Sequence, residues 1–242
     1  MNAVVVIPAY NLENIIGKVV SEAKKYVDVV VGIDIKTKDK TAEEAKKAGA
    51  EIILNAGNGK GEVLRTLFKY ALNKNYDYII SMDGDYQDKP EEIPNFISSI
   101  NDYDIINGSR YLEKMNGKLN LFGLINIILI KTSKINIIGN LLLFFIVNFI
   151  SFGFNFKSWV TDTQSGYRLF KREALLKILP YLNSRKYEIE TETLFFAGKF
   201  GLKIKEISKK VDIKRKGASW KDGLRIGYYS LRLWIKFINK TI

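Results

Sequence analysis

The first 110 residues alternate between short apolar runs and segments whose apolar positions recur every three or four residues. Short β-branched runs predict buried strands, and the longer spacing predicts amphipathic helices. Thr41 is a candidate N-cap, with Glu44 three residues later, and Gly49 would end that helix. The predicted strands are Val4–Ile7, Val27–Ile33, Glu51–Leu54, Tyr78–Met82 and Asp104–Asn107. The predicted helices are Ile15–Tyr26, Thr41–Ala48, Gly61–Asn73 and Pro90–Ile100.

This alternation predicts an α/β fold, with a mostly parallel sheet and helices on both of its faces. In sheets of this kind, ligands bind outside the carboxyl ends of the strands. Three polar clusters each follow a predicted strand, so we expect them to meet at one edge of the sheet. These clusters are Ala9–Asn14, Asp34–Lys40 and Asp83–Asp88.

The middle of the chain has a different composition. Residues Lys114–Thr161 contain five lysines and no Asp or Glu, and Ile135–Phe156 carries no charge. Such a segment fits helices in the membrane interface, a buried core hairpin or one spanning helix. We favour interface helices, because a spanning helix would put Asp83 and Asp162 on opposite sides of the membrane. The two apolar runs are Leu121–Ile130 and Leu141–Ile150.

The C-terminal segment Trp220–Lys240 has a basic side and an apolar side when it is drawn as a helix. This pattern is typical of a helix lying on an anionic membrane, and equally of a helix packed on its own domain with a solvated basic side. We therefore divide the chain into one domain over residues 1–219, which includes the segment 114–160, and a C-terminal helix over 220–242. The basic residues are Lys221, Arg225, Arg232, Lys236 and Lys240.

Composition narrows the chemistry. The chain has 242 residues, a net charge of +12, no cysteine and no histidine. Disulfides, thiolate zinc sites and Ser-His-Asp triads are therefore excluded. Any catalytic group must therefore be a carboxylate, Lys, Arg, Tyr, Ser or a metal held by oxygen ligands. The positive charge indicates an anionic partner. Met1 leads into a strand without the basic region of a signal peptide, which predicts a cytoplasmic location.

Two turns after predicted strands carry candidate binding groups. Asp83 and Asp85 lie two residues apart, and with Gln87 they offer oxygen ligands to Mg²⁺ or Mn²⁺. A solvated turn is the alternative. The segment Gly57–Gly61 opens a helix and contains Lys60, so its backbone N–H groups suit an anion. A plain glycine-rich turn is the alternative there.

Three further segments are rich in polar groups. Arg110, after the fifth predicted strand, suits a phosphate, although a surface salt bridge is the simpler interpretation. Thr161–Arg168 is dense in polar side chains. Glu188, Glu190 and Glu192 would share one face of a strand, whereas on a helix Glu188 would pair with Glu192. The basic run Lys214–Lys216 with Ser219 suits a pyrophosphate or forms a solvated loop.

Taken in order, these motifs resemble the family-two glycosyltransferases with the GT-A fold. The nearest branch is similar to the dolichyl-phosphate or polyprenyl-phosphate hexose synthases. The resemblance covers about residues 3–219 and rests on six motifs in the family's order. These are Val6–Asn11, Asn58–Gly61, Asp83–Gln87 with Pro90–Pro94, Gly108–Arg110, Asp162–Arg168 and Tyr187–Glu192.

The resemblance implies a role for each matching residue. Asp162 and Gln164 would lie beside the sugar and the attacking oxygen, and Arg110 would hold the acceptor phosphate. Asp83, Asp85 and Gln87 would hold the metal and the diphosphate. The nucleotide pocket would be lined by Pro8, Ala9, Tyr10, Glu13, Asp34, Lys60 and Asp83. Further phosphate contacts would come from Lys131 and Lys134 and from the mobile loop residues Arg215, Lys216 and Ser219.

Two departures from the family pattern fall in the nucleotide pocket. Leu12 stands where the family has a Glu, and Ile35 follows Asp34 where the family has a second Asp. The sequence therefore does not decide which nucleotide base the sugar donor carries. The Gln-x-x-Arg-Trp signature of polysaccharide synthases is absent, because Gln164 is followed by Ser165, and this disfavours polymer synthesis.

The implied activity is inverting, metal-dependent transfer of a hexose from GDP-mannose or UDP-glucose to a polyprenyl phosphate, at the cytoplasmic face of a membrane. A phosphate acceptor is already ionised near pH 7, since the second pKa of a monoester is about 6, and needs no strong base. A sugar hydroxyl needs a base, and Asp162 is the candidate. The alternatives are transfer to a glycan or lipid hydroxyl and a catalytically weak membrane scaffold. Nucleic-acid binding is disfavoured, and pairing of two copies through the apolar helices stays open.

Overall fold

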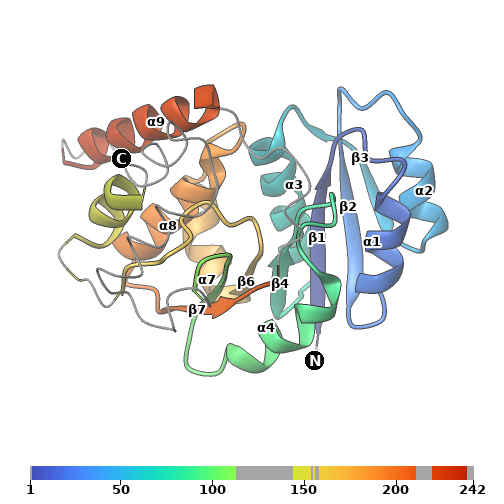
Figure 1. Ribbon diagram of the computed structural model, residues 1–242, viewed down its shortest axis with the longest axis horizontal. Coiled ribbons are helices and arrows are strands. Elements are labelled where there is room, and N and C mark those ends of the chain that lie inside the picture. Colours follow the sequence, from blue (N-terminus) through green and yellow to red (C-terminus); the bar gives the residue numbers. More distant parts are fainter. Residues whose placement is uncertain (1, 113–143, 154, 156–157, 211–219, 239–242) are drawn as a thin grey trace.

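A computed structural model describes the chain except for residues 1, 113–143, 154, 156–157, 211–219 and 239–242 (Figure 1). Five predicted phosphate contacts and most of the apolar segment 114–160 lie outside the described residues. These contacts are Lys131, Lys134, Arg215, Lys216 and Ser219.

The described strands form one seven-stranded sheet in the order β3-β2-β1-β4-β6-β5-β7. All neighbouring strands run parallel except β6, which is antiparallel to both β4 and β5. The predicted fold class, a mostly parallel sheet with helices on both faces, is confirmed. The strands are β1 (Ala3–Ala9), β2 (Asp28–Asp34), β3 (Glu51–Gly57), β4 (Tyr78–Ser81), β5 (Ile105–Ser109), β6 (Arg168–Lys171) and β7 (Ile204–Ser208).

Helices cover both faces of this sheet (Figure 1). Successive strand residues face opposite sides, so Val4 and Val6 join one core while Val5 and Ile7 join the other. All four are fully buried, which explains why β1 is a continuous apolar run. The first core is shared with α3 (Lys60–Asn73), α7 (Arg172–Ile178), α8 (Glu188–Lys199) and α9 (Trp220–Ile238). The second is shared with α1 (Ile16–Ala23), α2 (Thr41–Lys47) and α4 (Ile93–Ser99).

The structure corrects two details of the predicted helices. Thr41 is the first residue of α2 and does not cap it, because its hydroxyl accepts a hydrogen bond from the Leu12 amide at 2.7 Å and bonds to Asp39. The predicted helix Pro90–Ile100 is split into a 3-10 turn, Pro90–Glu92, and α4. A second 3-10 turn, Leu179–Tyr181, follows α7.

The described part of the apolar segment contains one helix, residues 144–152. Phe144, Val147 and Ile150 are buried, whereas Phe145 and Phe149 are exposed. Among the described residues, no helix combines the length and the hydrophobicity that crossing a bilayer requires.

The helix α9 packs on the domain. Ile226 and Leu233 are buried, and two side-chain contacts join α9 to α8: Arg225 pairs with Glu188, and the Tyr229 hydroxyl donates to Glu192 at 2.5 Å. Ile226 and Leu233, two apolar residues of the predicted helix, therefore face the domain and not a membrane.

Candidate functional site

The three polar clusters meet at the carboxyl edge of the sheet, as predicted. The loop after β1 is tied to the loop after β2, because the Lys38 amide donates to Asn11 and the Lys40 amide donates to Glu13. The loop after β2 reaches the next strand–helix turn, since the Gly59 amide donates to Asp34 at 2.5 Å. These contacts hold the segments that follow β1, β2 and β3 together at one edge of the sheet.

Leu12, one of the two departures from the family pattern, packs against the turn after β4. A Cβ on Gly84 would lie 2.8 Å from the Leu12 side chain and 3.0 Å from that of Ile7. The turn between Asp83 and Asp85 therefore lies directly on an apolar shelf that includes Leu12.

The residues expected to line the nucleotide pocket differ in exposure. Ala9 is buried in β1, Tyr10 is 55% exposed and Pro8 is half-buried. Asp34 is buried and accepts backbone hydrogen bonds from Lys36 and Gly59. Tyr10 is thus an exposed aromatic ring at this edge, where a ligand can reach it.

Backbone amides around the start of α3 are already bonded within the protein. The Gly61 amide donates to the Arg185 carbonyl at 2.9 Å, and the Asn58 amide donates to the Glu62 carboxylate at 2.9 Å. A Cβ on Gly61 would lie 2.5 Å from the Ser184 carbonyl oxygen, so glycine allows this close approach. These contacts satisfy the amides of Gly61 and Asn58, and the Lys60 side chain is the cationic candidate at this turn.

Lys60 bridges two carboxylates. Its Nζ lies 2.6 Å from Asp83 Oδ1 and 2.8 Å from Glu190 Oε1. Burial alone would lower the pKa of Lys60, but Asp83 and Glu190 raise it above its usual value. Burial would raise the pKa of Asp83, and the Lys60 ammonium instead holds it below its usual range. Both groups are therefore charged at neutral pH.

The turn after β4 is ordered by its own side chains and by the residue that follows β7 (Ile204–Ser208). The Gln87 amide nitrogens donate to Asp85 at 3.1 and 2.8 Å. The Asp83 backbone amide donates to Asp88 at 3.0 Å, and Asp88 forms a buried ion pair with Lys209 at 2.5 Å. Lys209, directly after the last strand, thus helps to fix the position of the Asp83 turn.

These oxygens suit a hard divalent cation that is shared with a phosphate ligand. Carboxylates two residues apart, with an amide oxygen nearby, are the ligand types that Mg²⁺ and Mn²⁺ prefer. Among the described residues, no three acidic side chains gather into an all-protein cage. Asp83, Asp85 and Gln87 could hold such a cation together with oxygens from a ligand.

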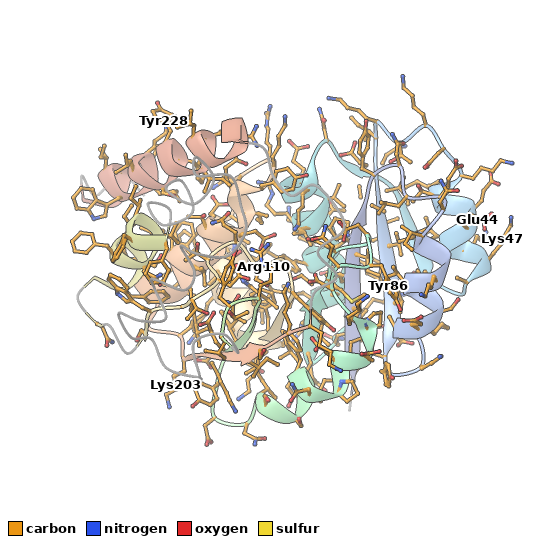
Figure 2. All side chains as sticks on the ribbon, viewed as in Figure 1. Glu44, Lys47, Tyr86, Arg110, Lys203 and Tyr228 are labelled. Carbon is orange, nitrogen blue, oxygen red and sulfur yellow. The ribbon has the colours of Figure 1, made fainter. Side chains whose placement is uncertain are left out.

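Asp162 and Arg110 form a bidentate ion pair. Arg110 Nε and one terminal nitrogen each lie 2.7 Å from a different Asp162 oxygen, and the Arg110 amide adds a bond of 3.1 Å. The Asp162 side chain is 1% exposed, and that of Arg110 is 33% exposed near the middle of the molecule (Figure 2). Burial would raise the pKa of Asp162, but Arg110 holds it below its usual range.

Gln164 and Glu206 complete this part of the site. The Gln164 side chain donates to the Thr191 hydroxyl at 2.9 Å. Glu206, on β7, accepts hydrogen bonds from the backbone amides of Thr161 and Asp162 at 2.6 and 3.1 Å. The sequence analysis did not identify Glu206. It lies in a short strand, and no local pattern there indicates a role in the site. It is a positioning residue for the turn that carries Asp162.

Arg168 links this turn to α8. It is fully buried, and its guanidinium donates to the Asn107 side chain, the Glu190 carbonyl and the Thr163 carbonyl at 2.8, 2.7 and 3.2 Å. One of its nitrogens also lies 3.6 Å from the Glu190 carboxylate. The three alternate acids lie on a helix, where Glu188 and Glu192 both face α9 and Glu190 faces Lys60.

Comparison with known proteins gives concordant results. The sequence model described as Glycosyl transferase family 2 matches residues 4–179. The UDP-N-acetylglucosamine–dolichyl-phosphate N-acetylglucosaminyltransferase of Methanococcus voltae is 30% identical over 223 residues, covering 84% of this chain and 82% of that protein. The undecaprenyl-phosphate mannosyltransferase of Micrococcus luteus is 26% identical over 220 residues, covering 86% and 82%. Mannosyl-3-phosphoglycerate synthase from Rubrobacter xylanophilus shares the fold, at 12% identity and a TM-score of 0.55, over 100% of this chain and 75% of its own.

Proposed function

Because the chain belongs to glycosyl transferase family 2, we propose that it transfers a hexose from a GDP- or UDP-sugar to a polyprenyl phosphate, with inversion at the anomeric carbon. Transfer takes place at the cytoplasmic face of a membrane. The Arg110–Asp162 pair carries this proposal, because it favours an acceptor that needs no base.

A general base must be free to accept a proton, and its pKa must lie near the working pH. Asp162 meets neither condition, because both of its oxygens bind Arg110 and its pKa is held below the usual range. A phosphate monoester needs no such base, since its second pKa is about 6. Arg110 also retains a terminal nitrogen that is not used by Asp162, and this nitrogen suits a phosphate oxygen.

The donor lies across the ends of β1, β2 and β4. Tyr10 and Asp34 are the candidate contacts for the nucleoside, and Lys60 is a candidate for the diphosphate. Asp83, Asp85 and Gln87 would hold Mg²⁺ or Mn²⁺, which neutralises the charge on the leaving diphosphate. The acceptor phosphate then attacks the anomeric carbon from the side opposite the leaving group, so a single displacement inverts that centre.

An exposed apolar stripe on α9 supports a membrane contact. We define the α9 stripe as Leu224, Tyr228, Leu231 and Ile235, which are 66%, 69%, 44% and 53% exposed. At about 100° per residue, the four side chains lie within about 60° of one another. Exposed Arg232 and Lys236 lie along one flank, which suits anionic lipids. Tyr228 extends outward from the end of the molecule opposite the start of β1 (Figures 1 and 2).

Replacing Tyr228 and Ile235 together by serine is expected to weaken binding to vesicles at least about tenfold, because two apolar side chains no longer enter the lipid. The measurement is cosedimentation with phosphatidylcholine vesicles containing phosphatidylglycerol. The control carries Leu54→Ser and Leu176→Ser, two residues that are 64% and 48% exposed on other elements. Equal binding by both variants would contradict the membrane contact. A change in sedimentation of the protein alone would assign the stripe to a second copy of the chain.

A transfer assay tests the proposed function directly. Thermal shifts with GDP, UDP and their hexose conjugates, with and without Mn²⁺, identify the donor base. At a ligand concentration near 100 times its dissociation constant, we expect about 2.7 kcal/mol of stabilisation. The matching labelled sugar nucleotide is then offered to a polyprenyl phosphate and to the corresponding polyprenol. Labelled lipid from the phosphate alone supports the proposal, and labelling of the alcohol, or no thermal shift with any nucleotide, would overturn it.

A further inference from the structure

Lys60 is placed where a metal bound to Asp83 would meet a second positive charge. Its ammonium is 2.6 Å from Asp83, and the Lys60 side chain is 14% exposed. Glu190, only 5% exposed, holds it from the other side at 2.8 Å. We infer that Lys60, anchored by Glu190, couples metal binding to diphosphate binding. This inference rests on the proposed function, because it assumes that Asp83 is a ligand of the metal.

The ammonium has little room to move away. A Cβ on Gly166 would lie 2.7 Å from Lys60 Nζ and 2.9 Å from Asp83 Oδ2, so the backbone of residue 166 closes over the ion pair. The start of α3 is held by the hydrogen bond from Gly61 to the Arg185 carbonyl. Glu190 is in turn positioned by buried Arg168. The positive charge therefore stays beside Asp83 when ligands bind.

Charge balance gives the consequence. Asp83, Lys60, Glu190 and Arg168 together carry two negative and two positive charges. A divalent cation added alone meets the repulsion of Lys60 and binds weakly. A nucleoside diphosphate brings negative charge that both Lys60 and the metal attract. Each ligand therefore strengthens the binding of the other by the same factor, as linkage requires.

The test measures Mn²⁺ binding from the signal of the free ion in electron paramagnetic resonance, with and without the nucleoside diphosphate. In Lys60→Met, we expect Mn²⁺ alone to bind about tenfold more tightly, and we expect the enhancement by diphosphate to fall about tenfold. In Glu190→Gln, Lys60 loses its balancing charge, so Mn²⁺ alone is expected to bind more weakly than to the wild type. The control is Lys47→Met, which removes an exposed lysine paired with Glu44 on α2 (Figure 2).

The opposite signs separate coupling from damage to the fold. General disruption of the site would weaken Mn²⁺ binding in both variants, and that result would overturn the inference. An unchanged affinity and enhancement in Lys60→Met would also overturn it. If Lys60→Met does not fold, the double variant Lys60→Met/Glu190→Gln serves in its place. It removes one charge of each sign, so its affinity for Mn²⁺ alone should stay near that of the wild type, while the enhancement by diphosphate should fall about tenfold. An unchanged enhancement in the double variant would overturn the inference. Failure of the proposed function gives a different result from failure of this inference. If the proposed function is wrong, the wild type binds no nucleoside diphosphate. The Mn²⁺ affinities of the variants still show whether Lys60 affects a metal bound to Asp83.

Discussion

Replacing Arg168 by methionine is expected to lower the free energy of unfolding by about 3–5 kcal/mol, which is the usual loss when one partner of a buried charge pair is removed. The guanidinium is fully buried and satisfies the Asn107 side chain and two backbone carbonyls. Methionine fills similar space but leaves these acceptors, and the Glu190 charge, without their donor. Urea denaturation measures the change as a shift of the midpoint.

The matched control is Arg185→Met. Arg185 also pairs with a glutamate, Glu62, but its side chain is 81% exposed. An exposed pair contributes about 0–1 kcal/mol, so this variant is expected to unfold close to the wild type. Equal destabilisation of the two variants would mean that the buried network around Arg168 contributes no more to the stability of the domain than an exposed ion pair does.

Replacing Asp162 by asparagine is expected to lower kcat/KM for transfer to polyprenyl phosphate about 100-fold. Asparagine keeps the shape of the side chain but loses the charge that orients Arg110 through two hydrogen bonds. The loss of activity at low pH, the acid limb of the pH profile, should remain in this variant. Activity falls below about pH 6 in both proteins, because the acceptor phosphate loses its second negative charge there. The pKa of Asp162 lies below its usual range, so this carboxylate stays ionised throughout the limb.

The pH profile separates the two classes of acceptor. Were Asp162 a general base for a hydroxyl acceptor, the asparagine variant would lose the acid limb together with its activity. Asp102→Asn is the control, since Asp102 is an exposed aspartate outside the site. A control variant with the same loss as Asp162→Asn would contradict the role of the Arg110–Asp162 pair.

Much of the first half of the fold could be predicted from the sequence. Strands such as β1 are buried on both faces, and this produces continuous apolar runs that local patterns detect. The strand β6 could not be predicted in this way, because it begins with Arg168, a residue type that is rarely buried. Its burial depends on acceptors from β5, α8 and the preceding turn, and no local pattern records them.

The candidate site shows the same division. Residues that follow the strands were expected at one edge because strand direction alone places them there. Their pairing was not predictable: Arg110 and Asp162 are 52 positions apart, and Lys60 meets Glu190 only after α8 has packed. The amides at the start of α3 looked available for an anion, yet the Arg185 carbonyl satisfies one of them. Sequence position predicts which residues gather, and packing decides which of them remain free.

The place of β6 in the sheet also determines the order in which the chain can fold. The strands β3, β2, β1 and β4 pair with one another and are complete after Ser81, so this half can form early during synthesis. The strand β5 joins β4 only through β6, which follows it by more than 50 residues, so it must wait. Pairing of distant segments is slow, because the closure entropy of a long loop is lost before contacts form. The ribosome therefore releases the half that holds Asp34 and Asp83 well before the half that holds Arg110 and Asp162, and we expect closure around β6 to limit the rate of maturation.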